Sequence, residues 1–108
     1  MMARYMLDTD TCSYIMKRSN PAVLRRLKAV PVADVCMSVI TKCELQYGVE
    51  VSPRRAQDAA ALAAFLPYVA VRELPDEVAS HYAEIRADLK RRGALIGGND
   101  LLIAAHAL

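Results

Sequence analysis

The sequence has 108 residues, of which 55% are hydrophobic and 24% charged, with four glycines and five prolines. This composition predicts one globular domain over residues 1–108 and excludes a multidomain enzyme. Lys and Arg number 14 and Asp and Glu 12, a formal charge of +2, and no basic arm or acidic tail marks a partner. No apolar run approaches the roughly 20 residues of a membrane span, and we expect no signal peptide, because Arg4 and Asp8 interrupt the apolar core that one would need. We therefore expect a cytoplasmic protein without a membrane partner.

The cysteines do not predict a disulfide framework or a zinc site. Cys12, Cys36 and Cys43 form no C-x-x-C pair, and their number is odd. The two histidines, His81 and His106, are far apart in the sequence and have no neighbouring cysteine. A reducing compartment fits this pattern.

The first third of the chain predicts one strand and two helices. Residues 3–8 are mostly apolar and end in Asp8, which indicates a buried strand. Residues 12–18 can form a short helix, for which Asp10 is available as a cap without Asp8. Asn20 followed by Pro21 is a typical helix start, so a second helix is expected there.

The middle of the chain predicts a strand followed by two helices. Residues 35–40 are apolar and partly β-branched, as in a strand. Thr41 and Glu44 have the spacing of a capping box, which predicts that a helix starts at Thr41. Residues 52–53, Ser-Pro, predict the start of an alanine-rich helix that ends before Pro67.

The last third predicts a strand over residues 69–74, a helix from residue 75 to Gly93 and a buried apolar helix over residues 100–108. Strands that alternate with helices indicate an α/β fold with a parallel sheet and right-handed crossovers. Ligands bind such sheets at the carboxyl ends of the strands.

Several acidic residues are expected at that edge. Asp8 ends the first strand, Glu44 lies shortly after the second, and Asp100 starts the last helix, with Ser38 near the end of the second strand. Glu44 has an ordinary explanation in the capping box, and Asp100 has one in the helix dipole. Asp8 is harder to explain in this way, because a carboxylate that ends an apolar strand must be desolvated, capped or bound to a cation. Acids that face one crevice repel each other unless a cation lies between them, and Mg²⁺ prefers such oxygen ligands. A bound Mg²⁺ can activate water against a phosphodiester, which is hydrolytic nuclease chemistry.

Three segments together resemble the PIN-domain ribonucleases, and among them the VapC-like toxins of bacterial toxin–antitoxin modules. The segments are residues 5–10 (YMLDTD), 38–48 (SVITKCELQYG) and 96–108 (IGGNDLLIAAHAL). The resemblance implies a three-layer PIN-like fold with a parallel sheet flanked by helices. It also implies a Mg²⁺- or Mn²⁺-dependent endoribonuclease that acts on RNA, forms a homodimer and is neutralised by a cognate antitoxin protein.

The resemblance assigns the metal site to the acids named above. Asp8, Glu44 and Asp100 match the metal-binding and catalytic acids of the family, and Ser38 and Asn99 are expected to support them. Members of the family normally continue beyond the helix that holds Leu108, so we expect a fold truncated at its C-terminus. An alternative function is therefore a catalytically impaired PIN-like module that binds an antitoxin or another partner.

A second enzymatic hypothesis starts from Asp8-Thr9-Asp10. This pair of aspartates after an apolar strand resembles the first motif of the haloacid-dehalogenase-like phosphatases, with Asp8 as nucleophile and Asp10 as general acid. Cys12 departs from that motif, and no suitable lysine motif follows.

Overall fold

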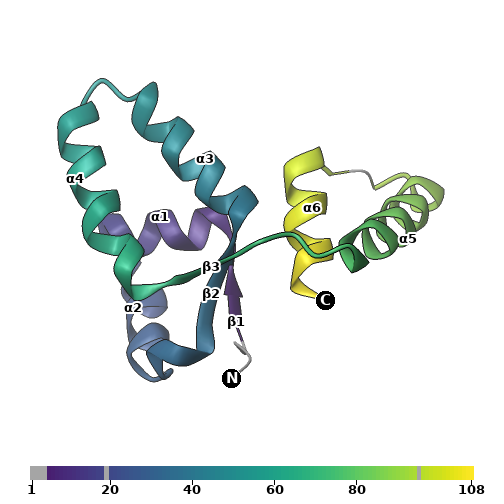
Figure 1. The fold of residues 1–108 in the computed structure, drawn as a ribbon, viewed down its shortest axis with the longest axis horizontal. Helices are drawn as coiled ribbons and strands as arrows, with labels where there is room; N and C mark the ends of the chain where they lie inside the picture. The colour runs from purple at the N-terminus through teal and green to yellow at the C-terminus, as the bar shows by residue number, and fades with distance from the viewer. Residues whose placement is uncertain (1–4, 19, 95) are drawn as a thin grey trace. The chain divides into compact units, whose positions relative to one another are not determined.

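The computed structural model describes residues 5–18, 20–94 and 96–108. It forms two compact units, Met1–Arg72 and Glu73–Leu108. The elements in chain order are β1 (Tyr5–Leu7), α1 (Thr9–Lys17), α2 (Pro21–Lys28), the 3₁₀ helix η1 (Val32–Asp34), β2 (Val35–Ser38), α3 (Val39–Glu50), α4 (Arg55–Phe65), the 3₁₀ helix η2 (Leu66–Tyr68), β3 (Ala70–Arg72), α5 (Glu77–Arg92) and α6 (Gly98–Ala107) (Figure 1).

The first unit is built on a parallel sheet. The strand order is β1-β2-β3, and both pairs are parallel. Tyr5 is paired with Val35 and Leu7 with Met37, while Ser38 is paired with Arg72. The strands are joined through helices, as parallel neighbours require. The expected α/β fold with a parallel sheet flanked by helices is confirmed.

The core of this unit lies around β2, which is buried along its whole length because it has a neighbour on each side. Met37 is fully buried and belongs to one apolar cluster with residues of α1, α3 and α4. The expectation of a buried first strand is only partly correct, because Tyr5 is 41% exposed. The buried core residues are Cys12, Val35, Met37, Leu45, Leu62, Phe65 and Val69.

The start of α2 and the end of α5 lie where the sequence predicts them. The Asn20 side chain accepts a hydrogen bond from the Val23 N–H at 3.3 Å, and Pro21 is the first residue of α2. Helix α5 ends at Gly93, which adopts the left-handed conformation with φ of 69°. Glycine has no Cβ and tolerates this conformation, which explains the stop.

The predicted capping box of Thr41 and Glu44 is wrong. Helix α3 begins at Val39, and its N-cap is Ser38, whose Oγ accepts from the Ile40 N–H at 3.2 Å. The predicted strand therefore ends at Ser38, and Val39 and Ile40 are helical. Sheet pairing extends to Ser38 on the β3 side and stops there, so the strand ends at the residue whose hydroxyl caps α3. Glu44 is consequently an interior residue of α3.

The first helix also starts earlier than the sequence indicates. Asp8, and not Asp10, is the N-cap of α1, and its Oδ1 accepts from the Thr11 N–H at 2.8 Å. Smaller differences occur at the other boundaries. Helix α4 begins at Arg55, two residues after the Ser52-Pro53 pair, β3 is shorter than predicted, and α6 begins at Gly98.

The second unit consists of α5 and α6, which pack against each other. Val78 of α5 and Leu101, Ile103 and Ala105 of α6 are buried. Of the helices in the described part of the chain, none combines the length and apolar character that a membrane crossing needs.

The observed cap predicts opposite effects for two hydroxyl substitutions. Ser38→Ala removes the N-cap of α3 and is expected to lower the free energy of unfolding by about 1 kcal/mol. Thr41→Val replaces a fully buried hydroxyl that has no hydrogen-bond partner among the described residues, so stability should be unchanged within about 0.5 kcal/mol or should increase. Urea unfolding followed by circular dichroism measures both. A loss of stability in Thr41→Val with none in Ser38→Ala would support the capping box instead.

Candidate functional site

The candidate site of the first unit lies where β1 and β2 end. Leu7 and Met37 are paired, and Asp8 and Ser38 are the next residues of the two chains. Helices α1 and α3 start directly after them, at the same end of the sheet (Figure 1). The carboxyl ends of parallel strands are the common ligand-binding edge of α/β sheets.

Asp8 is exposed, and its carboxylate is held at the start of α1. One oxygen, Oδ1, accepts from the Thr11 N–H. The helix dipole stabilises a negative charge at this position. Among the described residues, no hydrogen bond is made to Oδ2, so this oxygen is available to a ligand.

Glu44 is half-buried on α3, and its carboxylate is held by a residue of α1. Thr9 Oγ1 donates a hydrogen bond to Glu44 Oε1 at 2.6 Å. Because Thr9 directly follows Asp8, this bond brings the Glu44 carboxylate to the first turn of α1. Thr9 is not among the site residues that the sequence predicts. Its position next to an aspartate at a strand end was the available signal.

Two hydroxyl groups near this site are fully buried. Ser38 caps α3, and Thr41 lies one helical turn before Glu44. Thr41 Oγ1 has no hydrogen-bond partner among the described residues. A buried hydroxyl without a partner is unfavourable, so a bound water or ligand oxygen at Thr41 would be stabilising.

Asp100 and Asn99 belong to the other unit, Glu73–Leu108. Both are exposed in the first turn of α6, where the helix dipole favours the Asp100 carboxylate. In the described part of the first unit, the acidic, histidine and cysteine side chains form no group of three that could hold a metal ion. The structure thus joins Asp8 and Glu44 through Thr9, and the site of three acids stays a prediction.

Cys12, in the first turn of α1, is buried. Burial raises the pKa of its thiol from 9.0 to about 12, and the negative charge of Asp8 adds to this effect. The thiol is therefore protonated at neutral pH and does not act as a nucleophile or a metal ligand there.

The donor atoms around Asp8 and Glu44 fit a hard divalent cation. Each carboxylate uses one oxygen in the hydrogen bonds described above, and Mg²⁺ or Mn²⁺ prefers carboxylate oxygens, one or two of them with several waters. Cys43 is exposed and Cys12 is buried and protonated, so these thiols do not offer a softer ligand set.

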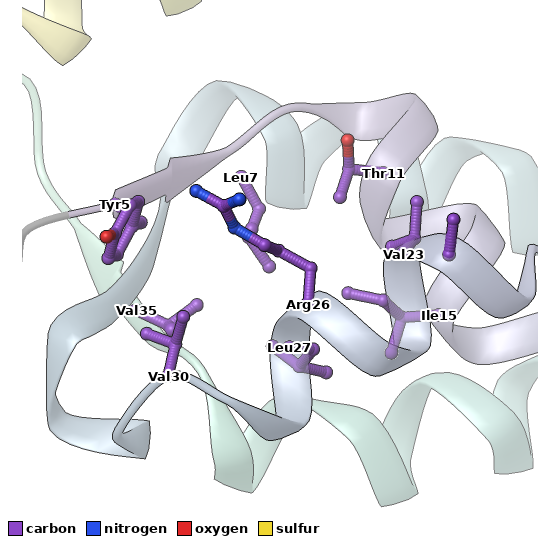
Figure 2. Close-up of a pocket in the computed structure, with 10 residues that line it drawn as sticks. Tyr5, Leu7, Thr11, Ile15, Val23, Arg26, Leu27, Val30 and Val35 are labelled. Atoms are coloured by element: carbon purple, nitrogen blue, oxygen red, sulfur yellow. The ribbon is translucent and has the colours of Figure 1, made fainter.

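Two cavities border α1, and they differ in chemistry. A cavity of about 170 Å³ includes Glu44 in its wall, together with Thr9 and Lys17. Another cavity, of about 310 Å³, lies between β1, α1 and α2, and neither Asp8 nor Glu44 lines it (Figure 2). Figure 2 shows apolar side chains around this second cavity and the Arg26 side chain directed toward β1. The smaller cavity is the one that adjoins the candidate site.

Comparisons with known proteins find relatives along nearly the whole chain. Residues 5–108 match the family model described as PIN domain. Ribonuclease VapC2 of Haemophilus influenzae is 38% identical over 106 residues, which cover 98% of this chain and 80% of that protein. The tRNA(fMet)-specific endonuclease VapC of Salmonella typhimurium is 35% identical with the same coverage. The solved structure of VapBC2 from Rickettsia felis, bound to a DNA fragment from its promoter, has a TM-score of 0.86 and 33% identity, and the match covers 99% of this chain and 80% of that one.

The burial of Cys12 predicts its reactivity. A pKa raised from 9.0 to about 12 lowers the thiolate fraction at neutral pH roughly 1,000-fold, so a thiol reagent should label the exposed Cys43 long before Cys12. Pulse labelling followed by peptide mass spectrometry measures both rates. All three cysteines should react at similar rates in guanidinium chloride, and equal rates for Cys12 and Cys43 in the native protein would contradict the packing of α1.

Proposed function

Because the chain belongs to the PIN-domain family, we propose that it is an endoribonuclease that hydrolyses RNA phosphodiester bonds as the toxin of a toxin–antitoxin module. The observation that carries this proposal is the 38% identity to a ribonuclease VapC over 98% of the chain. The family also selects between the two enzymatic hypotheses, because it is the PIN family and not that of the dehalogenase-like phosphatases.

We infer that Asp8, Glu44 and Asp100 hold a Mg²⁺ or Mn²⁺ ion. When bound, such an ion lowers the pKa of water and stabilises negative charge on a phosphodiester. The chain's own residues prepare the site. The Thr11 N–H holds Asp8 and the Thr9 hydroxyl holds Glu44, and each bond leaves the second oxygen of its carboxylate available. Preorganised carboxylates need little rearrangement when the substrate arrives.

We propose that RNA approaches through the cavity beside Glu44. Lys17 lines this cavity, and its ammonium group is suited to contact a phosphate of the RNA backbone. Phosphate contacts of this kind position the substrate without reading its sequence. Ser38 acts indirectly, because it caps the helix that carries Glu44.

The partner proposed for this chain is an antitoxin protein. The similar solved structures from Rickettsia felis and Salmonella typhimurium are named as VapBC complexes bound to DNA. We propose that this chain likewise binds a cognate antitoxin and forms a homodimer in the cytoplasm.

The nuclease proposal is tested by RNA cleavage. The chain, incubated with tRNA or another structured RNA and Mg²⁺ or Mn²⁺, should release internal fragments, and a chelator should stop the reaction. Asp8→Asn should lower the rate on the order of 100-fold, the effect of removing one stabilising group. Asp34→Asn is the matched control, because Asp34 precedes β2 at the other end of the strand, and it should keep the wild-type rate.

Three results would contradict the nuclease proposal. Chelator-insensitive cleavage would exclude metal-dependent hydrolysis. Turnover of a small phosphate ester with covalent phosphate on Asp8 would indicate the phosphatase chemistry. Absence of RNA cleavage together with tight binding of an antitoxin would indicate the partner-binding module.

Metal binding is tested separately by calorimetric titration with Mn²⁺ in the absence of RNA. Wild-type protein should bind the ion, and Asp8→Asn, Glu44→Gln and Asp100→Asn should each weaken binding at least tenfold, because each removes a negatively charged ligand. Asp34→Asn is again the control. Unchanged affinity in the three variants would show that these carboxylates serve as helix caps and helix-surface charges only.

A further inference from the structure

We propose that Thr9 is a positioning residue, whose hydroxyl fixes the orientation of the Glu44 carboxylate relative to Asp8. The inference rests on the proposed metal-dependent nuclease function, and it concerns a residue that carries no charge and is not expected to bind the ion itself.

The hydrogen bond from Thr9 to Glu44 has the geometry of a strong interaction. The distance between Thr9 Oγ1 and Glu44 Oε1 is 2.6 Å, which is typical of a bond between an O–H donor and a carboxylate oxygen. The bond is partly buried and joins residues 35 positions apart. A hydroxyl has a single proton to donate, so this bond uses the whole donor capacity of Thr9.

The donor is more rigid than the acceptor. Thr9 is β-branched, which restricts its χ1 angle in a helix, and it sits in the first turn of α1 directly after the Asp8 cap. Glu44 has three rotatable side-chain bonds and is an interior residue of α3. The bond therefore holds the flexible Glu44 carboxylate at a fixed position relative to the N-terminus of α1.

The same turn of α1 thus controls both carboxylates. Its Thr11 N–H holds Asp8 Oδ1 and its Thr9 hydroxyl holds Glu44 Oε1. Among the described residues, Asp8 Oδ2 and Glu44 Oε2 accept no hydrogen bond. Loss of the Thr9 hydroxyl would leave every proposed metal ligand present. The distance between the Asp8 and Glu44 carboxylates would no longer be fixed.

The docking of α1 on α3 does not depend on this bond. Cys12 of α1 and Leu45 of α3 are buried in one apolar cluster, and burial of such side chains supplies most of the packing free energy between helices. The effect expected from Thr9 is therefore on the site, with a smaller effect on stability.

The test compares Thr9→Val, which keeps the shape and removes the donor, with Thr9→Ser, which keeps the donor. Thr9→Val should lower kcat for RNA cleavage and Mn²⁺ affinity about 10-fold to 100-fold, the usual effect of losing a group that orients a metal ligand. Thr9→Ser should keep both quantities within about threefold of wild type, because its hydroxyl can make the same bond.

A matched control separates positioning from stability. The Asn20 side chain accepts from the Val23 N–H at the start of α2, and Asn20 does not line the cavity beside Glu44, so Asn20→Ala removes a hydrogen bond at another place in the first unit. Its urea midpoint should fall at least as much as that of Thr9→Val because a helix cap is lost, while its kcat and Mn²⁺ affinity should remain those of wild type.

Three results would overturn the proposal about Thr9. The first is a Thr9→Val variant with unchanged kcat and Mn²⁺ affinity, and the second is a Thr9→Ser variant that is as impaired as Thr9→Val. The third is a wild-type chain that binds no Mn²⁺. If wild type binds Mn²⁺ but cleaves no RNA, the proposed nuclease function fails. The Mn²⁺ affinities of the two Thr9 variants then still decide the role of Thr9.

Discussion

The arrangement of the site depends on one constraint, that each of the first two strands passes into its helix through a single capping residue. Asp8 follows β1 and caps α1, and Ser38 ends β2 and caps α3. Parallel pairing of Leu7 with Met37 places these caps side by side. Two helix N-termini therefore start at the same sheet edge, and the first turn of α1 comes within hydrogen-bonding distance of α3.

This constraint also explains how acidic groups tolerate each other's proximity. Two carboxylates near one another raise each other's free energy unless each has its own donor. Here Asp8 has the Thr11 N–H and the dipole of α1, and Glu44 has the Thr9 hydroxyl. Both donors are local to one helical turn, so the fold itself holds the two carboxylates in place.

The sequence predicts the parts of this arrangement that depend on local chemistry. Asn20 before Pro21 and Gly93 after α5 mark helix ends correctly, because capping and the left-handed conformation are properties of a few residues. The start of α3 was mispredicted because Ser38 and Thr41 both have cap-forming hydroxyls, and the choice between them depends on where pairing with β1 and β3 ends. The bond from Thr9 to Glu44 is a tertiary contact, so no periodicity or spacing could have revealed it.

The location of the acids on the elements suggests why stability and chemistry can be separated in this fold. Asp8 and Asp100 lie at helix starts, where the dipole offsets their charge, and Glu44 is bonded to Thr9. The apolar cluster that includes Met37 holds the sheet and the helices of the first unit together, and its members are buried whereas Asp8 is exposed and Glu44 half-buried. Folding of the first unit then depends chiefly on burial of that cluster, while a cation would act on carboxylates such as those of Asp8 and Glu44, which hydrogen bonds already hold in place. Substitutions at the acids should accordingly impair chemistry far more than they impair the fold.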